Sequence, residues 1–442
     1  MSTQSNKFLF DRAIGYSFIL KIWQSIAGLF GIYLVANYFS TELQGFYYTF
    51  ISLIALQLFV ELGLYLVITN AASHEWANLN LSTDGSINGD QKALSRLVSL
   101  GRFAFKWYSA ASLVIWIIVG ALGYFFLNQN NIVNINWEIQ WIVQVTLSSL
   151  LFLFMPLLSL LEGCNQIEQV AKFRLLQSIA ANISFWLSIL ADAQLWALPI
   201  LSFTSLIFCI YYLINVKRRF FAPFYLKPKF ECISWKSEIL PMQWRLAIQG
   251  LMNYFGFYIF TPVMFYYFGA ESAGQMGMSQ QIVAAIISIS LIFVTVKVPK
   301  FGMLVSTRNF IALDVEWFRA SIYSAFLMTL GIVSLLSLQF LLIKIGWVPI
   351  HRLLSPLPLF YLCLGSFFGM LIQCLAMYLR AHKRELLTLS GFFSGVMIGS
   401  LVWGLGSNFG STGATCGYLL VMSLFSFPAT LVIFLKAKKS WH

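Results

Sequence analysis

The chain has 442 residues, of which 59% are hydrophobic and only 10% are charged, and its mean hydropathy is +0.78. Soluble domains carry about 25% charged residues, so this composition excludes an ordinary soluble protein and indicates an integral membrane protein. The formal net charge is +12 at pH 7, and its explanation lies in where the basic residues stand along the chain.

Apolar segments recur along the whole chain. A helix needs about 20 residues to cross the roughly 30 Å hydrocarbon core of a bilayer, and runs of that length predict about twelve transmembrane helices. In chain order they lie at 14–36, 46–69, 107–127, 139–161, 175–191, 195–215, 246–268, 276–296, 321–343, 356–378, 386–405 and 413–435. The expected fold class is therefore an all-α integral membrane protein.

The basic residues show a strong asymmetry between alternate connections. With the N-terminus inside the cell, nearly all of the 28 Lys and Arg residues fall on cytoplasmic segments, and the opposite side holds only Lys344 and Arg352. Basic residues are retained on the cytoplasmic side of short loops, so both termini are predicted to be cytoplasmic. Topology thus explains the net charge, and no nucleic-acid partner is expected.

A basic, proline-containing segment divides the chain near its midpoint. The predicted organisation is an N-terminal six-helix lobe at 1–215, a cytoplasmic linker at 216–244 and a C-terminal six-helix lobe at 245–442, with a central cavity between the lobes. Pro223, Pro228 and Pro241 argue against one continuous helix in the linker. YFSTELQG at 38–45 and YFGAESAG at 267–274 share Tyr, Phe, Glu and Gly in register, which favours an internal duplication but is also compatible with common turn chemistry.

Lys21 and Glu61 are the only formal charges inside the twelve predicted spans. An ionisable group at membrane depth costs about 2.5–3.5 kcal/mol on insertion scales, so it usually faces the protein interior and finds a partner. Both residues lie twenty positions from Thr41, near the turn between the first two spans, which suggests an ion pair at similar depth. Two interpretations stay open: a pair that fixes helix packing, and a pair that takes part in substrate or ion coupling.

A second polar group opens the seventh predicted span. Arg245, Gln249 and Asn253 recur every four residues and therefore share one helical face. Such a stripe is more stable facing a cavity than lipid, although Arg245 alone could snorkel to the headgroups. Gln24 adds an amide one turn from Lys21. Together these residues predict a polar, partly cationic vestibule.

Motifs for catalysis are not found. The four His residues and six Cys residues show no metal-ligand spacing, and the chain has no Gly-rich phosphate loop or paired carboxylate motif. We therefore expect no enzyme activity, no cofactor and no metal site.

The chain resembles polysaccharide-unit flippases of the Wzx type, which belong to the multidrug/oligosaccharidyl-lipid/polysaccharide exporter superfamily. The resemblance extends over nearly the whole chain and rests on YFSTELQGFYYTF (38–50), LQLFVELGL (56–64), SHEWA (73–77), LPMQWRLAIQG (240–250), AGQMGMS (273–279), KVPKFG (297–302) and YLRAHKRE (378–385). It implies a two-lobed transporter of the bacterial inner membrane that acts in O-antigen or lipopolysaccharide biosynthesis. Such a protein moves an undecaprenyl-pyrophosphate-linked oligosaccharide to the periplasmic leaflet by alternating access, and polysaccharide polymerase and chain-length proteins are its implied partners.

The resemblance also suggests roles for the polar residues. A pyrophosphate headgroup needs cationic hosts, for which Lys21 and Arg245 are the candidates. Sugars need amides and aromatic faces, and the candidates are Gln24, Gln249, Asn253 and Tyr254. Flipping in this family is thought to be driven by cation antiport, and Glu61 is the candidate ion-coupling residue.

Two rival functions remain. A multidrug exporter of the same superfamily is the nearest, but export of organic cations favours an acidic pocket, whereas the polar residues here are partly cationic. A membrane polymerase or ligase acting on lipid-linked sugars is the other. Its chemistry would need an extended periplasmic surface, and all predicted periplasmic connections are short.

Overall fold

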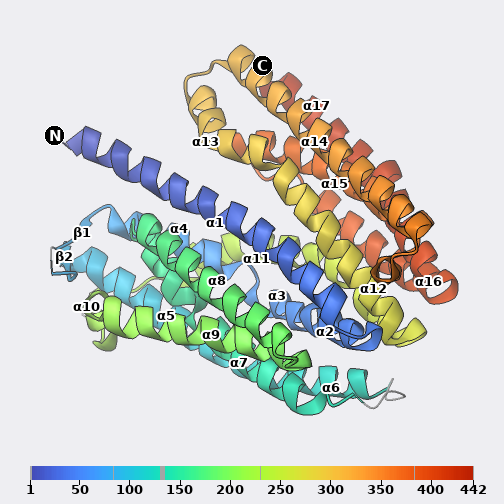
Figure 1. The fold of residues 1–442 in the computed structure, drawn as a ribbon. Coiled ribbons are helices and arrows are strands. Elements are labelled where there is room, and N and C mark those ends of the chain that lie inside the picture. Colours follow the sequence, from blue (N-terminus) through green and yellow to red (C-terminus); the bar gives the residue numbers. More distant parts are fainter. Residues whose placement is uncertain (1, 83, 130–134, 229, 383, 442) are drawn as a thin grey trace. The chain divides into compact units, whose positions relative to one another are not determined.

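The computed structural model is almost entirely helical (Figure 1). It describes residues 2–82, 84–129, 135–228, 230–382 and 384–441, and within these ranges it describes all side chains except those of 2–14, 236–237, 241–242, 245–246, 249, 251, 253 and 348. Many large apolar side chains on the helices are exposed, among them Phe125 and Ile345. Exposed apolar side chains are unfavourable in water but stable in lipid. Helices suit the same environment, because they satisfy their own backbone hydrogen bonds. The chain is an all-α, multi-pass membrane protein.

The chain divides into two compact units, each of which contains segments from both halves of the sequence. Unit 1 comprises 1–27 and 54–250, and unit 2 comprises 28–53 and 251–442. Helix α1 (Ser2–Tyr38) therefore contributes to both units. The predicted lobes at 1–215 and 245–442, with the linker between them, stay a prediction.

Unit 1 consists of the first part of α1 and the segments from η1 to α11. Its helices and strands are η1 (Ala55–Gln57), α3 (Leu58–Glu61), α4 (Leu64–Trp76), β1 (Leu79–Leu81), β2 (Ile87–Gly89), α5 (Gln91–Val114), η2 (Ile115–Val119), α6 (Gly120–Asn128), α7 (Glu138–Gly163), α8 (Ile167–Leu190), η3 (Gln194–Trp196), α9 (Ala197–Tyr211), η4 (Tyr212–Val216), α10 (Arg218–Phe221), η5 (Ala222–Tyr225), η6 (Trp235–Ile239) and α11 (Leu240–Asn253).

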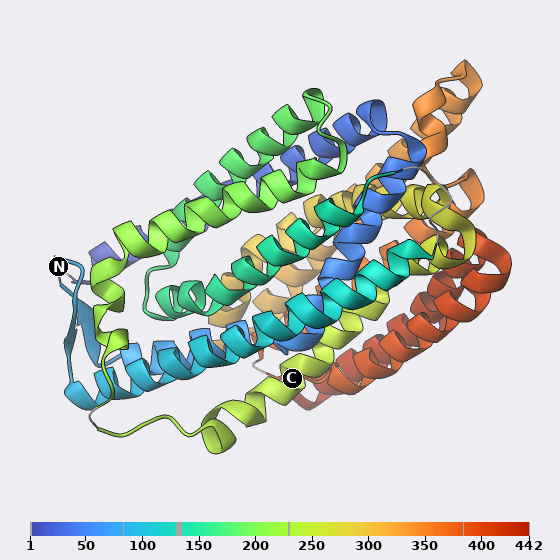
Figure 2. The same cartoon turned by 90° about the horizontal axis from the view of Figure 1, so that it is seen from below.

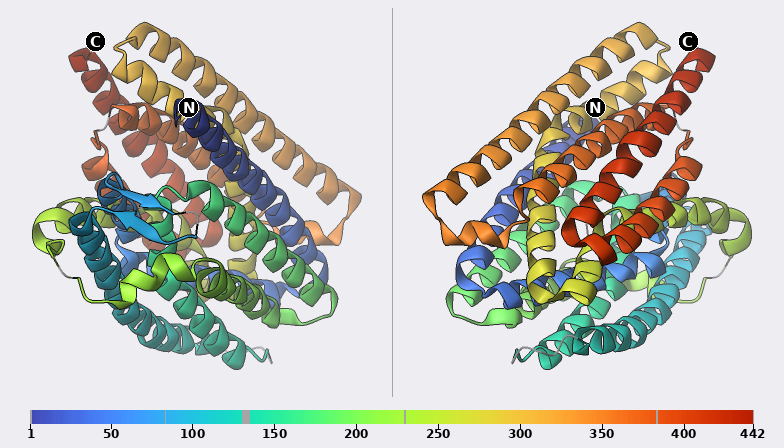
Figure 3. Two further views of the ribbon diagram at one scale, coloured as in Figure 1. Left: turned by 90° about the vertical axis from the view of Figure 1, so that its left-hand side faces the viewer. Right: turned by 90° about the vertical axis from the view of Figure 1, so that its right-hand side faces the viewer.

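Unit 2 consists of the end of α1, helix α2 and the segments from η7 onward. Its elements are α2 (Thr41–Ile54), η7 (Tyr254–Tyr258), α12 (Phe260–Ser290), α13 (Ile292–Ser306), α14 (Phe310–Ile345), η8 (Val348–Arg352), α15 (Pro356–Ala381), α16 (Thr388–Leu420), η9 (Val421–Ser426) and α17 (Phe427–Trp441). Helices α13 and α14 form an antiparallel hairpin, and α14 and α17 pack against α15 (Figure 3). A buried cluster that includes Phe301, Met328, Met370 and Tyr378 joins these helices.

Each predicted span falls on helical segments of the structure. Among the described residues, 9 helices are long and apolar enough to cross a membrane, or up to 10 if the bent pair Tyr254–Ser290 and Ile292–Ser306 counts as one span. The number is below twelve partly because α12 and α16 each run through a predicted connection. Both are broken there at a glycine with positive φ, Gly269 (84°) and Gly410 (61°), a conformation that L-residues with side chains rarely adopt.

The second predicted span is also interrupted. After the 3₁₀ turn η1 and the short helix α3, Leu62 and Gly63 adopt left-handed conformations with φ of 53° and 67°. Helix α4 then starts in a new direction, because two successive left-handed residues cannot continue a right-handed helix. This break separates Glu61 from the face that carries Tyr65.

One end of unit 1 is held together by polar contacts between segments that are distant in sequence. Strands β1 and β2 form an antiparallel hairpin in which Asn80 pairs with Asn88, and α10 lies beside it (Figure 2). Arg96 on α5 bonds Glu75 at the end of α4 (2.8 Å) and Glu238 in η6 (2.5 Å). Among the described residues of the linker that precede α11, the structure contains only short helical turns, so the prediction that the linker is not one continuous helix is confirmed. Pro241 itself lies inside the first turn of α11.

The last glycines of the two similar octapeptides, 38–45 and 267–274, lie against each other inside unit 2. A Cβ added at Gly274 on α12 would lie 3.0 Å from the backbone nitrogen of Gly45 on α2, and one added at Gly45 would overlap the carbonyl group of Ala270. Gln44, only 1% exposed, donates from its amide to the carbonyl oxygens of Gly274 (2.9 Å) and Arg352 (3.2 Å). The repeated glycines therefore permit a close helix crossing, as small residues do between membrane helices.

Candidate functional site

A polar pocket of about 450 Å³ lies inside unit 1. Helix α7 supplies most of its apolar wall, including Phe152 and Met155, while α1, η1, α4, α8 and α9 contribute polar groups. The polar lining consists of Gln24, Gln57, Tyr65, Ser148, Arg174, Gln177, Ser178, Asn182 and Ser205. Ligand sites combine apolar walls with a few convergent polar groups in the same way.

Helix α8 contributes the densest set of these polar groups. Counted from Arg174, the other members follow after three, four and eight positions: Gln177, Ser178 and Asn182. This spacing places all four side chains on one helical face. The helix lies within a candidate membrane span, Ile167–Leu190. A polar face on a membrane helix is stable when it is turned toward the protein interior or a hydrated cavity. The pocket therefore accounts for the polar face of α8.

Arg174 is the one formally charged side chain among the described residues that line this pocket. Its Nη2 lies 3.0 Å from Glu162 Oε1 and donates to the hydroxyl of Tyr65, and its guanidinium carbon lies 5.5 Å from the centre of the Tyr65 ring. Both contacts use a single nitrogen, whereas a guanidinium carries five N–H donors in a planar fork. The remaining donors suit a carboxylate or a phosphate group.

The break at Leu62 and Gly63 brings Tyr65 to Arg174, because it redirects α4 before the tyrosine. Helix α4 then packs closely along α7. A Cβ added at Gly163 would lie 2.5 Å from the carbonyl oxygen of Thr69, and the Thr69 hydroxyl donates to the Ser159 carbonyl (3.3 Å). A ring held by such packing keeps the guanidinium in one orientation, which lowers the entropy cost of binding an anion.

Helix α9 also lines the pocket and packs against α8. Gln177 donates to the carbonyl oxygen of Ser205 (2.7 Å), and behind this contact the buried Gln144 donates to the hydroxyl of Ser202 (3.0 Å). Trp23 of α1 lies against Trp186 of α8, with ring centres 5.8 Å apart. These contacts hold the amides and hydroxyls around Arg174, and such groups can bind sugar hydroxyls.

Of the predicted site residues, Gln24 lines this pocket, whereas Lys21 is exposed on α1. Glu61 is half-buried at the end of α3, within electrostatic reach of Tyr108 on α5. The predicted ion pair between Lys21 and Glu61 is wrong: none of the ion pairs among the described residues contains either one. The depth argument assumed an unbroken helix, but η1 changes both rise and rotation before Glu61.

The remaining predicted residues stand on α11 and just after it. Arg245, Gln249 and Asn253 belong to that helix, and their side chains lie outside the described part of the structure. Tyr254 begins the π-helical segment η7 in unit 2, where it is buried with its ring centre 6.1 Å from that of Tyr258. A substrate role for these four residues stays a prediction.

Sequence reasoning missed Arg174 because the predicted spans were too short. They ended at 161 and began again at 175, which placed Glu162 and Arg174 in a cytoplasmic connection, whereas helices α7 and α8 contain both residues. The signal that could have identified Arg174 is the polar spacing of α8, which matches the spacing that drew attention to Arg245.

The fold is shared with solved transporter structures. One is the lipid II flippase MurJ in an inward closed conformation, with a TM-score of 0.68, 14% identity, and coverage of 96% of this chain and 87% of that chain. An inward-facing multidrug resistance MATE family transporter of the MOP superfamily gives a TM-score of 0.63 at 11% identity, with 97% and 98% covered. The MATE transporter VcmN of Vibrio cholerae gives 0.58 at 11% identity, with 99% of each chain covered.

No protein-family model and no curated protein sequence matches the chain. The resemblance in fold extends over nearly the whole chain. At this level of identity it establishes the fold alone.

Proposed function

We propose that this protein is a flippase that moves an undecaprenyl-pyrophosphate-linked oligosaccharide from the cytoplasmic to the periplasmic leaflet of the bacterial inner membrane. The observation that supports it is Arg174, a guanidinium held by Tyr65 and Glu162 in a polar pocket within membrane helices. The fold shared with a lipid II flippase supports the same class of substrate.

In this proposal Arg174 binds an oxygen of the pyrophosphate through N–H donors that its protein partners do not use. Gln24 and Gln57 bind sugar hydroxyls, and the lipid tail stays in the bilayer. Lys21 and Arg245 are further candidate hosts for the headgroup. Alternating access would expose the pocket to each side of the membrane in turn.

Glu61 is the proposed ion-coupling residue. It is a half-buried acid in unit 1, at a helix break and within electrostatic reach of the fully buried Tyr108. An acid in such a position can exchange a proton when the surrounding helices move, because its charged form loses solvation as the site closes.

A multidrug exporter is the second candidate, because MATE transporters share the fold. The charge of the pocket separates the two functions. An organic cation would meet the guanidinium of Arg174, and like charges repel at close range, whereas a pyrophosphate would be attracted.

The deciding experiment compares both substrate classes in proteoliposomes. We expect the purified protein to move a fluorescent lipid-linked oligosaccharide between leaflets, measured as its accessibility to an external quencher. We also expect no accumulation of a fluorescent lipophilic cation. A proton gradient should accelerate flipping in the wild type and have no effect in Glu61→Gln.

The opposite pattern would refute the flippase. If the cation is transported and several lipid-linked oligosaccharides are not, the protein is an exporter. If Glu61→Gln responds to the gradient as the wild type does, Glu61 has no part in coupling.

A further inference from the structure

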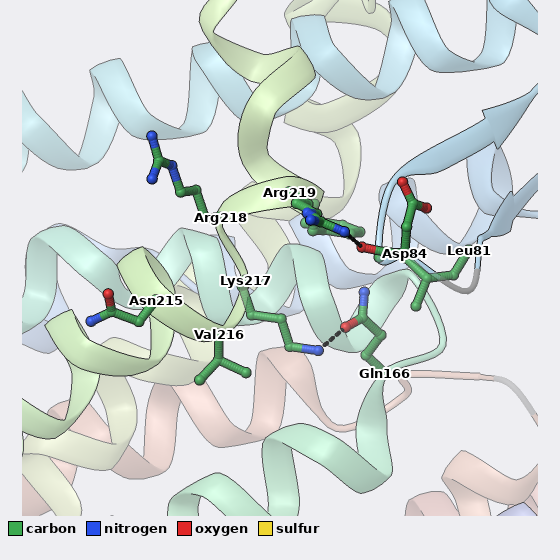
Figure 4. Close-up of a pocket in the computed structure, with 10 residues that line it drawn as sticks. Leu81, Asp84, Gln166, Asn215, Val216, Lys217, Arg218 and Arg219 are labelled. Atoms are coloured by element: carbon green, nitrogen blue, oxygen red, sulfur yellow. Dashed lines mark hydrogen bonds between the residues drawn. The ribbon is translucent and has the colours of Figure 1, made fainter.

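Two pockets adjoin each other at the end of unit 1 that carries the β-hairpin, apart from the pocket around Arg174. The first has a volume of about 320 Å³ and lies between the hairpin turn at Asp84, the residue Gln166 and the basic run Lys217–Arg219 (Figure 4). The second has a volume of about 640 Å³ and lies between α5, α7 and the aromatic turn that follows the basic run. Arg218 lines both, so the two pockets are neighbours.

Lys217 is a buried cation whose hydrogen-bond partners are neutral. It is only 8% exposed, and its ammonium donates to the amide oxygens of Gln166 (2.5 Å) and Gln169. Burial lowers the pKa of Lys217 to about 8. A buried charge is normally balanced by an opposite charge, and amide dipoles only partly replace one. The ammonium also lies 5.7 Å from the centre of the Tyr212 ring, but no ion pair among the described residues contains Lys217. The first pocket therefore offers a positive charge that no carboxylate balances.

Gln166 supplies a second donor to the same pocket. It is 4% exposed, and among the described residues its Nε2 has no hydrogen-bond partner. Figure 4 shows this nitrogen directed away from Lys217, toward the side of the pocket where Asp84 and Arg219 lie. A buried amide nitrogen without an acceptor is costly, which points to an acceptor that the protein itself does not provide.

The acid of this pocket does not neutralise Lys217. The carboxylate of Asp84 accepts hydrogen bonds from the backbone nitrogen (3.2 Å) and hydroxyl (2.8 Å) of Ser86 within its own turn, and Figure 4 shows it pointing away from Lys217. Arg219 donates to the backbone carbonyl oxygen of Asp84 (3.1 Å) and not to its carboxylate. Three consecutive basic residues thus line the pocket, although Figure 4 shows the side chain of Arg218 directed away from Lys217 and Gln166, and the one acid among the described lining residues is hydrogen-bonded within its own turn.

The second pocket combines an apolar wall with cations. Rings of Phe221 and Phe224, with centres 5.6 Å apart, form one wall. The wall is fixed in place, because Gly101 of α5 leaves room for Phe224 where any Cβ would overlap its ring. Arg102, Lys106 and Arg218 contribute positive charge, and no acidic residue is among the described residues that line this pocket.

We propose that these two pockets together bind one anionic phospholipid of the surrounding bilayer. Its phosphate lies in the first pocket with Gln166, Lys217 and Arg219, and an acyl chain lies in the second against Phe221 and Phe224. Charge complementarity selects a negatively charged headgroup, and the shared Arg218 connects the polar site with the apolar one. The site is separate from the proposed transport pocket and does not depend on the transported substrate.

Native mass spectrometry of the protein purified from mixed micelles tests this. With equal amounts of phosphatidylglycerol and phosphatidylcholine, we expect the wild type to retain phosphatidylglycerol preferentially. The variant Arg218→Gln/Arg219→Gln should lose about tenfold in retention, because one charge-assisted contact to the phosphate and the positive charge shared by both pockets are removed. Lys227→Gln is the matched control: it removes one charge from the same linker at an exposed residue that lines neither pocket, and it should retain lipid as the wild type does.

Three results would overturn the proposal. The first is equal retention of both lipids by the wild type, and the second is an equal loss in Lys227→Gln, which would indicate diffuse attraction to charge. The third is thermal stabilisation by inorganic phosphate that equals stabilisation by phosphatidylglycerol, which would indicate a site for a free anion. If the double variant does not fold, Arg219→Gln alone is compared with Lys227→Gln, since both side chains are exposed.

Discussion

Replacing Arg174 by alanine is expected to reduce flipping of the lipid-linked oligosaccharide by at least about thirtyfold, equivalent to ~2 kcal/mol. Truncating one member of a desolvated, hydrogen-bonded charge pair costs about 2–5 kcal/mol. In the proposed complex the guanidinium of Arg174 is the charged group of this pocket that meets the pyrophosphate. Initial flipping rates in proteoliposomes measure the effect. Arg174→Lys should restore only part of the rate, because lysine keeps the charge but not the planar fork of donors.

Variants at Glu162 distinguish a purely structural role of Arg174 from a role in binding the substrate. Removing the arginine leaves that carboxylate without its partner, which alone can destabilise the protein. The double variant Arg174→Ala/Glu162→Gln removes both charges. It should regain normal protein levels and thermal stability but remain inactive. Recovered transport in this variant would show that Arg174 only neutralises Glu162.

Lys172→Ala is the matched control for these variants. Lys172 is a cation on the same helix, two positions before Arg174, but it is exposed and does not line the pocket. It should transport at the wild-type rate. A loss equal to that of Arg174→Ala would mean that the charge of α8, and not the pocket, is responsible.

Gly45→Ala is expected to destabilise the protein by about 1–3 kcal/mol or more, the usual range for overpacking. The added methyl group would overlap the carbonyl group of Ala270, which is backbone and cannot turn aside as a side chain can. Relief would require α2 and α12 to separate, which would also break the hydrogen bonds from Gln44 to Gly274 and Arg352. The melting temperature in detergent should fall by about 5 °C or more.

Gly302→Ala provides the comparison within the same unit. Gly302 lies inside helix α13, and a Cβ there would meet nothing within 4 Å. Alanine has the higher helix propensity by up to about 1 kcal/mol, so this variant should melt at the wild-type temperature or slightly above. If Gly45→Ala and Gly302→Ala melt alike, the close crossing of α2 and α12 is not required for stability.

The positions of the helices followed from hydropathy, because any segment of about 20 apolar residues is unstable in water and stable in lipid. Hydropathy did not predict the exact ends of the helices. Glu162 and Arg174 fell outside the predicted spans because charged residues lower the local hydropathy, yet a helix continues through them when the charges pair with each other. For the same reason the sequence supplied Gln24 as a pocket residue but not Arg174, which lines the same pocket.

The two similar octapeptides, 38–45 and 267–274, were also only partly interpretable from the sequence. Their final glycines could be matched by register. Their role in packing could not be recognised, because a glycine in a turn and a glycine at a helix crossing look alike in sequence. The contact between Gly45 and Gly274 identifies the crossing. Whether the polar stripe of Arg245, Gln249 and Asn253 meets a substrate stays a prediction.

By itself the sequence determined that this is a helical membrane protein and roughly where its helices lie, because these properties depend on the local transfer of side chains between water and lipid. The side of the membrane that carries the basic loops stays a prediction. Only the tertiary structure decided that Tyr65, Glu162 and Arg174 form one site, that Lys21 and Glu61 do not pair, and that residues 28–53 belong to the same compact unit as 251–442. Those outcomes depend on helix breaks of one or two residues, such as Leu62 and Gly63, which rotate every later side chain.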